Sequence, residues 1–370
     1  MNPFRYGQVV KGRDFCRRPW LIKQLMNFIE TGQNVFLQGE RRTGKTSLIH
    51  EAVRKLAGYR LLYIDLLEVK TIGDMCRRMI TSILRAERKG GLQRKLMQTL
   101  AHLKPSLSID PVTGFPTISL DPRIAMRPDS IEGILDLIAG LGRRGKLVVS
   151  FDEFQDVLNI KESAEALALL RSRIQFHGNI TYLFAGSIKN RMNCIFTDPE
   201  SPFFKSAASL EVGHIDDDAF VPFLKGKFAS GKRDISKDTV RSVIRKAGGI
   251  PGDVQEVCAC IWDVTSEGEQ LTVKHLAPAL SMIFARENKA YEAALVQLTG
   301  QHLRCLVTLA KTGGTKPLSA EFLEESGIRT ASSVQAALKR LVKLKIIYQH
   351  KGAYRFANPF FGSWLIWKGY

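Results

Sequence analysis

The stretch 39-GERRTGKTSL-48 follows directly on the apolar run 35-VFL-37. Four residues separate its two glycines, and the second glycine is followed at once by a lysine and a threonine, which is the spacing of a phosphate-binding loop. Glycines let the backbone curl so that several N–H groups converge on phosphate oxygens, and the start of a helix adds the positive end of its dipole. The residues before the loop have the pattern of a buried strand, and those after it have the pattern of an amphipathic helix. We therefore predict a nucleotide site formed by Gly39, Glu40, Arg41, Arg42, Thr43, Gly44, Lys45, Thr46 and Ser47.

A second informative stretch, 146-KLVVSFDEFQDV-157, places two adjacent carboxylates after an apolar run. In a phosphate loop the lysine, here Lys45, contacts the β- and γ-phosphates, and the hydroxyl of Thr46 binds Mg²⁺. We expect Asp152 to hold the same Mg²⁺, directly or through water, and Glu153 to orient and deprotonate the attacking water. The alternative is the acidic start of an ordinary helix, but a site about 100 residues after a phosphate loop favours an ATPase.

Further apolar runs predict the rest of a parallel sheet. Residues 60–66 have the pattern of a second buried strand, and a last strand is expected at 208–213. The run 180-ITYLFAG-186 ends at Ser187, at the edge where ligands bind in such sheets. Ser187 is therefore a candidate sensor of the γ-phosphate, with a helix N-cap as the competing interpretation.

Composition limits the class of protein and its partners. The 370 residues carry a formal net charge of +18, which favours polyanionic partners, nucleic acid first and an anionic membrane surface second. No apolar run approaches the roughly 20 residues of a membrane span, and the N-terminus lacks a signal-peptide core. The six scattered cysteines lack metal-ligand spacing and are expected to be buried, reduced thiols of a cytoplasmic protein.

The remaining patterns predict three domains. Residues 1–213 form the ATPase domain, with a hairpin excursion near 105–122 where apolar and polar residues alternate. Residues 214–290 form a helical lid without strands, and residues 291–370 form three helices and a β-hairpin, which is a winged helix-turn-helix. Residues 286–300 are expected to be the link between lid and winged helix.

The third helix of the winged domain, 331–344, is the expected DNA-contacting element. Its apolar residues Val334, Ala337, Leu338 and Leu341 must face the core, which leaves a polar outer face. Ser332 and Gln335 are placed to reach base edges, and Lys339, Arg340, Lys343 and the wing residue Lys351 suit phosphates. The alternative is that this face packs on the ATPase domain, as the tail aromatics Phe360, Phe361, Trp364 and Trp367 are expected to do.

At this point the chain resembles a known group. The segments 12-GRDFCRRPWLIKQL-25, 39-GERRTGKTSL-48, 148-VVSFDEFQDV-157, 248-GGIP-251 and 354-YRFANPFFGSWL-365 are similar to archaeal-type P-loop ATPases, relatives of the AAA+ and STAND NTPases with a C-terminal winged helix. The resemblance implies an α/β fold with an ASCE-type P-loop NTPase sheet, ATP with Mg²⁺, and contact of the lid residue Pro251 with the nucleotide.

Two departures from the pattern concern arginines. AAA+ lids often carry an arginine just after the GGxP-like turn, where this chain has Gly252 and Asp253, and relatives tend to have one in the stretch matching 201–207, where only Lys205 stands. Arg191, Arg41 and Arg42 are the other candidate charge donors. We therefore expect low or regulated ATP turnover.

Three functions fit these observations. The first is an ATPase whose nucleotide state controls a DNA-binding winged helix. The second is a STAND-like signalling switch whose winged helix contacts protein, and the third is an AAA+ loader that assembles on DNA. ATP and duplex DNA are the expected partners, and a homo-oligomer or a protein partner stays open.

Overall fold

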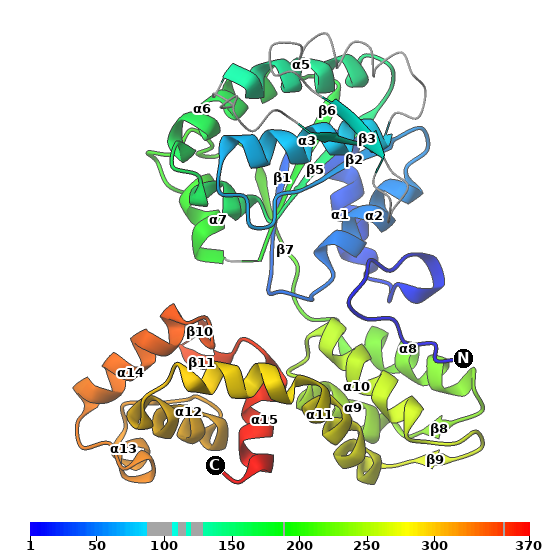
Figure 1. Cartoon of the computed structure of the whole chain (residues 1–370). Coiled ribbons are helices and arrows are strands. Elements are labelled where there is room, and N and C mark those ends of the chain that lie inside the picture. The colour runs from blue at the N-terminus through cyan, green and yellow to red at the C-terminus, as the bar shows by residue number, and fades with distance from the viewer. Residues whose placement is uncertain (87–105, 110–115, 120–128, 188, 351) are drawn as a thin grey trace. The chain divides into compact units, whose positions relative to one another are not determined.

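The computed structural model describes residues 1–86, 106–109, 116–119, 129–187, 189–350 and 352–370 (Figure 1). Residues Val9–His214 form one compact unit, and Met1–Gln8 join Ile215–Tyr370 in another. The first eight residues therefore lie outside the unit in which the sequence pattern placed them. The expected lid and winged helix share the second unit.

The first unit is built on a parallel sheet. Within the described residues its five strands follow the order β2-β5-β6-β1-β7, and they are β1 Val35–Gln38, β2 Arg60–Asp65, β5 Leu147–Asp152, β6 Ile180–Gly186 and β7 Ala208–Glu211. Because the strands are parallel, their carboxyl ends meet at one edge of the sheet. The phosphate loop after β1 and the carboxylates after β5 therefore lie at the same edge.

Helices cover both faces of this sheet (Figure 1). One face packs against α1 Pro19–Glu30 and α2 Lys45–Lys55, and the other packs against α3 Ile72–Ala86, α5 Asp129–Gly142, α6 Ser163–Ile174 and α7 Lys189–Phe196. Each face of the sheet forms a hydrophobic core with the helices that cover it. Alternate residues of β1 point into the two cores, Val35 and Leu37 on one face and Phe36 on the other. This is the predicted three-layer α/β arrangement of a P-loop NTPase.

Two parts of the first unit refine the predicted pattern. The strand predicted at 60–66 is present as β2, an edge strand in which Leu62 and Ile64 are buried and Arg60 is exposed. Leu62 and Ile64 join the core on one face, the half-buried Leu61 packs against the core on the other face, and no described strand covers the outer edge of β2. In the region of the expected hairpin, β3 Ser106–Ile109 pairs antiparallel with β4 Pro116–Ser119. The sequence pattern also predicts helix over residues 72–100, of which α3 covers the first part, and residues 87–100 lie outside the described residues.

The helical part of the second unit contains α8 Asp217–Ala229, α9 Lys237–Lys246, α10 Pro251–Asp263 and α11 Leu276–Val296. Local residues set its helix starts: the Ser236 side chain accepts from the Thr239 N–H, and Pro251 occupies the first turn of α10. The expectation of no strands is wrong, because β8 Asp234–Ile235 pairs in parallel with β9 Gln270–Leu271. Two-residue strands are too short to show an alternating pattern.

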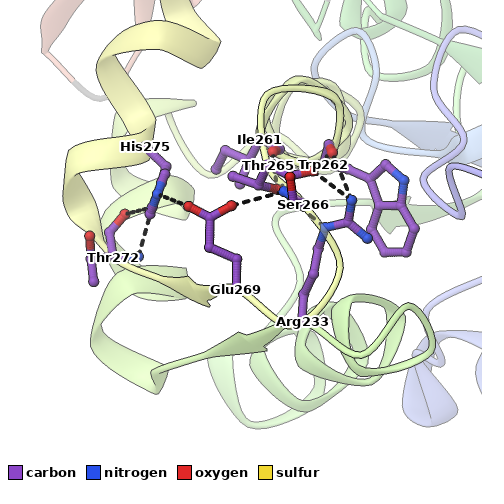
Figure 2. A network of polar contacts seen from close by, with 8 residues as sticks. All are labelled: Arg233, Ile261, Trp262, Thr265, Ser266, Glu269, Thr272 and His275. Atoms are coloured by element: carbon purple, nitrogen blue, oxygen red, sulfur yellow. Dashed lines mark hydrogen bonds and ion pairs between the residues drawn. The ribbon is translucent and has the colours of Figure 1, made fainter.

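A polar network fixes the end of α10 (Figure 2). The Arg233 guanidinium stacks on the Trp262 ring at 3.9 Å from its centroid and donates to the carbonyl oxygens of Trp262 and Thr265. The Trp262 carbonyl belongs to the last turn of α10, where carbonyl oxygens lack partners within the helix, and Thr265 lies just after the helix. Beside it, Glu269 accepts from the Ser266 N–H and pairs with the His275 ring. Arg233 thus has a structural role here.

The C-terminal part has the winged helix order α12 Gly300–Thr312, α13 Ala320–Ser326, α14 Ala331–Lys343, β10 Ile347–His350, β11 Ala353–Phe356 and α15 Pro359–Lys368. Gly313 and Gly327 end α12 and α13 in the left-handed conformation that glycine adopts without strain. The Ser319 and Thr330 hydroxyls accept hydrogen bonds from the Phe322 and Ser333 N–H groups in the first turns of α13 and α14. The predicted helices and hairpin are therefore present.

Helix α11 and the tail helix α15 correct two expectations. Residues 286–296 belong to α11 instead of forming a loose link, and Arg286 is bonded to Glu256 of α10. The tail does not need the ATPase domain for its burial, because Phe361 stacks on Tyr291 at 4.8 Å and the Trp364 indole donates to Asn288 at 3.1 Å. The helical part and the winged part thus share one continuous helix.

Two chain-wide expectations can be compared with the described residues. Cys16, Cys76, Cys258, Cys260 and Cys305 are buried and free, but Cys194 is exposed, so the expectation of burial is wrong for that thiol. In the part of the chain that the structure describes, a helix with the length and apolar content of a membrane span is not found.

Candidate nucleotide site

The loop after β1 adopts a tightly curled backbone. An added Cβ on Gly39 would lie 2.2 Å from the carbonyl oxygen of Val212, so a side chain cannot fit where the loop passes the end of β7. Gly44 and Arg42 both have left-handed backbone angles, with φ of 88° and 63°. Glycine adopts this conformation freely, whereas for arginine it costs about 1 kcal/mol. The loop therefore keeps its curled backbone despite the strain at Arg42. Curled backbones of this kind form concave sites in which N–H groups can bind an anion.

Lys45 begins α2 and points back into the loop. Its ammonium group donates to the carbonyl oxygens of Gly39 and Glu40, each at 2.9 Å, and the side chain is only 6% exposed. Burial lowers the pKa of Lys45, and the carboxylates of Glu153 and Asp152 oppose this shift. The hydrogen-bond acceptors of this nearly buried cation are neutral carbonyl oxygens. An anionic ligand would form stronger, charge-assisted hydrogen bonds with it.

The next residue along α2 meets the carboxyl end of β5. The Thr46 hydroxyl donates to Asp152 Oδ2 at 2.6 Å, although the two residues are 106 positions apart. The Tyr63 hydroxyl on β2 donates to the same oxygen at 2.8 Å. Burial and the nearby Asp152 carboxylate raise the pKa of Tyr63, so the phenol keeps its proton. A hydroxyl and a carboxylate at this spacing are the oxygen ligands that Mg²⁺ prefers.

Glu153 stands beside this pair in a strained conformation. Its φ is 50°, in the left-handed region, directly before the short 3-10 helix η3 Phe154–Asn159. The Ser187 hydroxyl, at the end of β6, donates to Glu153 Oε2 at 2.8 Å. The structure thus brings together four of the residues singled out in the sequence, Thr46, Asp152, Glu153 and Ser187. The backbone of Glu153 is not that of a regular helix start. Strain of this kind persists only where surrounding contacts impose it.

The segment before α1, to which we assigned no role from the sequence, also forms hydrogen bonds with the loop. The buried Arg18 guanidinium donates to the carbonyl oxygens of Thr43 at 2.7 Å and Gly213 at 3.1 Å. The Val10 N–H donates to the Ser47 hydroxyl at 3.1 Å. Arg18 therefore ties the loop to the chain that follows β7. Arg18 lies in 12-GRDFCRRPWLIKQL-25, one of the stretches that carry the family resemblance. That resemblance was the only feature of the sequence that could have pointed to a role for this residue.

The candidate charge donors differ in their surroundings. Arg191 pairs with Asp156 at 3.5 Å and donates to Asn159 at 2.8 Å. Lys205 lies over the Phe204 ring at 5.1 Å. Arg41 and Arg42 are exposed at the tip of the loop. Arg191 is thus already engaged by a carboxylate, and the loop arginines are the more accessible charges.

The other predicted site residues belong to the second unit. Pro251 opens α10 after Gly248 and Gly249, which both have left-handed φ angles. Helix α14 buries the four residues predicted to face the core, Val334, Ala337, Leu338 and Leu341. Its exposed residues include Ser332, Gln335, Lys339, Arg340 and Lys343, and also Val342. Lys351 lies outside the described residues. The structure therefore confirms which face of α14 is polar.

Family comparisons match two separate parts of the chain. Residues 29–191 match a model described as an AAA domain. Residues 289–367 match a model described as a probable winged helix domain. A search of curated proteins finds no match.

Solved structures show the same fold over nearly the whole chain. A Walker-type ATPase of Pyrococcus abyssi is 21% identical, with a TM-score of 0.65, and the match covers 98% of this chain and 99% of that one. The ORC2 protein of Aeropyrum pernix, in ADPNP–ADP complexes, is 16% identical with a TM-score of 0.52 and coverage of 94% and 93%. The ORC1 protein of the same organism, in complex with DNA, is 13% identical with a TM-score of 0.51 and coverage of 95% and 92%.

Proposed function

We propose that this chain, a P-loop ATPase of AAA type with a C-terminal winged helix domain, binds ATP with Mg²⁺ and hydrolyses it slowly. We further propose that the bound nucleotide controls DNA binding by the winged helix. The observation that carries the nucleotide part is the 2.6 Å contact between the Thr46 hydroxyl and the Asp152 carboxylate beside the curled loop.

The residues present fit a magnesium–nucleotide complex. The loop offers backbone N–H groups at the start of α2, and Lys45 is the cation that would exchange its carbonyl partners for β- and γ-phosphate oxygens. Thr46 and Asp152 would hold Mg²⁺, which supplies neutralising charge to the phosphates when bound. Mg²⁺ usually keeps water and phosphate oxygens as its other ligands, so two protein oxygens would be enough to hold it.

Glu153 is the proposed base for hydrolysis. An attacking water would give its proton to the Glu153 carboxylate while its oxygen bonds to the γ-phosphorus, and the bond to the β-phosphate oxygen breaks to release ADP. Lys45 would neutralise the charge on the phosphates. We infer slow turnover because Arg191 is already paired with Asp156. Ser187, which contacts Glu153, is placed to report the γ-phosphate to the base.

Two substitutions test the nucleotide part. Lys45→Ala should abolish tight ATP binding, measured by titration with a fluorescent ATP analogue. Glu153→Gln should keep ATP affinity within about twofold and reduce steady-state phosphate release by about 100-fold, the usual contribution of a general base. Hydrolysis by Glu153→Gln at the wild-type rate would show that Glu153 is not the base.

The DNA part rests on the exposed face of α14. Lys339, Arg340 and Lys343 lie on this face and suit phosphate contacts, with Ser332 and Gln335 nearer its N-terminus for base edges. The chain's charge of +18 supports a polyanionic partner, as does the likeness in fold to the ORC1 protein solved with DNA. Short side chains near the start of α14 favour electrostatic binding with weak sequence preference.

Contacts that connect α10, α11 and α15 within the second unit support the proposal that nucleotide controls the winged helix. Pro251 and the turn before it are the proposed lid contacts to nucleotide, and α10, which begins there, is bonded to α11 through Glu256 and Arg286. Helix α11 in turn packs against α15 of the winged part. A lid that moved on nucleotide binding would therefore carry the winged helix with it.

A charge-matched pair of variants tests the DNA part. Replacing Lys339, Arg340 and Lys343 together with Ala should weaken duplex binding, and the slope of log K against log salt should flatten by about 0.9 for each phosphate that is no longer neutralised. The control replaces the exposed Lys237, Arg245 and Lys246 of α9 with Ala, which removes the same charge elsewhere in the unit. Equal effects of both variants would remove α14 as the DNA-binding element and favour the signalling switch, whereas ATP-dependent growth of the particle on DNA would favour the loader.

A further inference from the structure

The carboxylate of Glu153 accepts a second hydrogen bond from a residue of its own segment. Gln155 Nε2 donates to Glu153 Oε2, the oxygen that also accepts from Ser187. Among the described residues, Glu153 Oε1 has no hydrogen-bond partner. One carboxylate oxygen is therefore held by two donors, and the other is available to accept a proton.

Gln155 is fixed in a single orientation by its surroundings. The side chain is only 1% exposed, and within the described residues its Oε1 atom has no partner. An amide turned the other way would put this oxygen against an acceptor-only carboxylate, which is unfavourable. The amide hydrogen must therefore face Glu153.

A neighbouring glycine makes room for this amide. An added Cβ on Gly186, the last residue of β6, would lie 2.5 Å from Gln155 Oε1 and 2.4 Å from the Met192 sulfur. Gly186 directly precedes Ser187, the second donor to Glu153. The end of β6 therefore leaves space for the Gln155 amide and also provides the Ser187 hydroxyl. The two donors to Glu153 are thus arranged together.

We propose that Gln155 is a positioning residue for the base: with Ser187 it fixes Glu153 Oε2, so that Oε1 is presented to the attacking water. This inference rests on the proposed ATPase function and adds to it a residue that acts only through Glu153. It also gives Ser187 a part in holding the base. The strained φ of Glu153 fits this role, because the two hydrogen bonds keep the carboxylate in place against a more relaxed backbone.

The test compares Gln155→Leu, which keeps the approximate volume, with Gln175→Leu on an exposed glutamine as the control. Gln155→Leu should lower kcat about 10- to 100-fold, the scale expected when a catalytic group shifts by about 1 Å. ATP affinity, measured separately, should stay within about twofold. Placed in a Glu153→Gln background, Gln155→Leu should change the residual rate by less than about twofold, because its effect passes through Glu153.

A second variant covers the case in which Gln155→Leu does not fold. Gln155→Met is an unbranched, flexible replacement that also lacks the amide donor, and it should lower kcat by a similar factor while ATP affinity stays within about twofold. A kcat of the folded Gln155 variant within twofold of wild type, or an equal loss in the Glu153→Gln background, would overturn the inference. A wild-type chain without ATP turnover would overturn the proposed function as well, which separates the two failures.

Discussion

Substituting Gly39 with Ala should damage both the fold and the nucleotide site. The new Cβ would lie 2.2 Å from the Val212 carbonyl oxygen, whereas close carbon–oxygen contacts are about 3.3 Å, so one backbone must move by about 1.1 Å. Neither side can yield freely, because the Val212 N–H donates to the Gln38 carbonyl oxygen at 2.8 Å. Losing such a hydrogen bond costs about 1 kcal/mol, and overpacking costs about 1–3 kcal/mol more.

The expected loss of about 2–4 kcal/mol can be measured by thermal unfolding. For a unit of about 200 residues this corresponds to a fall in Tm of roughly 5–15 °C. ATP affinity should also fall at least about tenfold, because the displaced loop no longer directs its N–H groups at the phosphates. Gly178→Ala is the matched control, since its added Cβ meets open space at an ordinary backbone angle. If Gly39→Ala and Gly178→Ala have the same Tm and affinity, the loop is not packed against β7 as described.

Two further substitutions probe single hydrogen-bonded groups of the first unit, one at the site and one on α2. Tyr63→Phe removes one hydrogen bond that orients Asp152, so the Mg²⁺ concentration for half-maximal turnover should rise about tenfold, and an unchanged Mg²⁺ requirement would count against Asp152 as the metal ligand. The hydrogen bond from Arg54 holds the pKa of Glu51 below its ordinary 4.5. The Glu51 carboxylate therefore stabilises the fold above about pH 4.5, and that stability is lost as the pH falls through the lower pKa of the folded state. Glu51→Gln should be less stable than wild type at pH 7 and approach it in strong acid, whereas a pH-independent difference would contradict this role.

Local patterns explain what could be predicted from the sequence. The phosphate loop depends on spacing within eight residues, and the polar face of α14 follows from helical periodicity around Val334 and Leu338. The pairing of Thr46 with Asp152 could be expected because parallel strands end at one edge of the sheet. Each of these inferences needs only neighbouring residues or a general rule of sheet topology.

Interactions between distant residues explain what could not be predicted. Arg18 bonds carbonyl groups 25 and 195 positions away, and no local period marks such a residue. Tyr63 reaches Asp152 across neighbouring strands, where it could equally have been a core tyrosine. Residues 286–296 are rich in charge and were expected to be a link, but packing of Tyr291 against α15 keeps them helical. Tertiary packing therefore decided these elements.

The most direct test of the central claim measures duplex DNA affinity in defined nucleotide states. The Glu153→Gln chain would be saturated with Mg²⁺-ATP, and then with Mg²⁺-ADP, and titrated with the same labelled duplex at fixed salt. Coupling between the sites predicts affinities that differ at least about fivefold, and DNA should change ATP affinity by the corresponding factor because coupling is reciprocal. Equal DNA affinities in the ATP, ADP and nucleotide-free states would contradict nucleotide control of the winged helix.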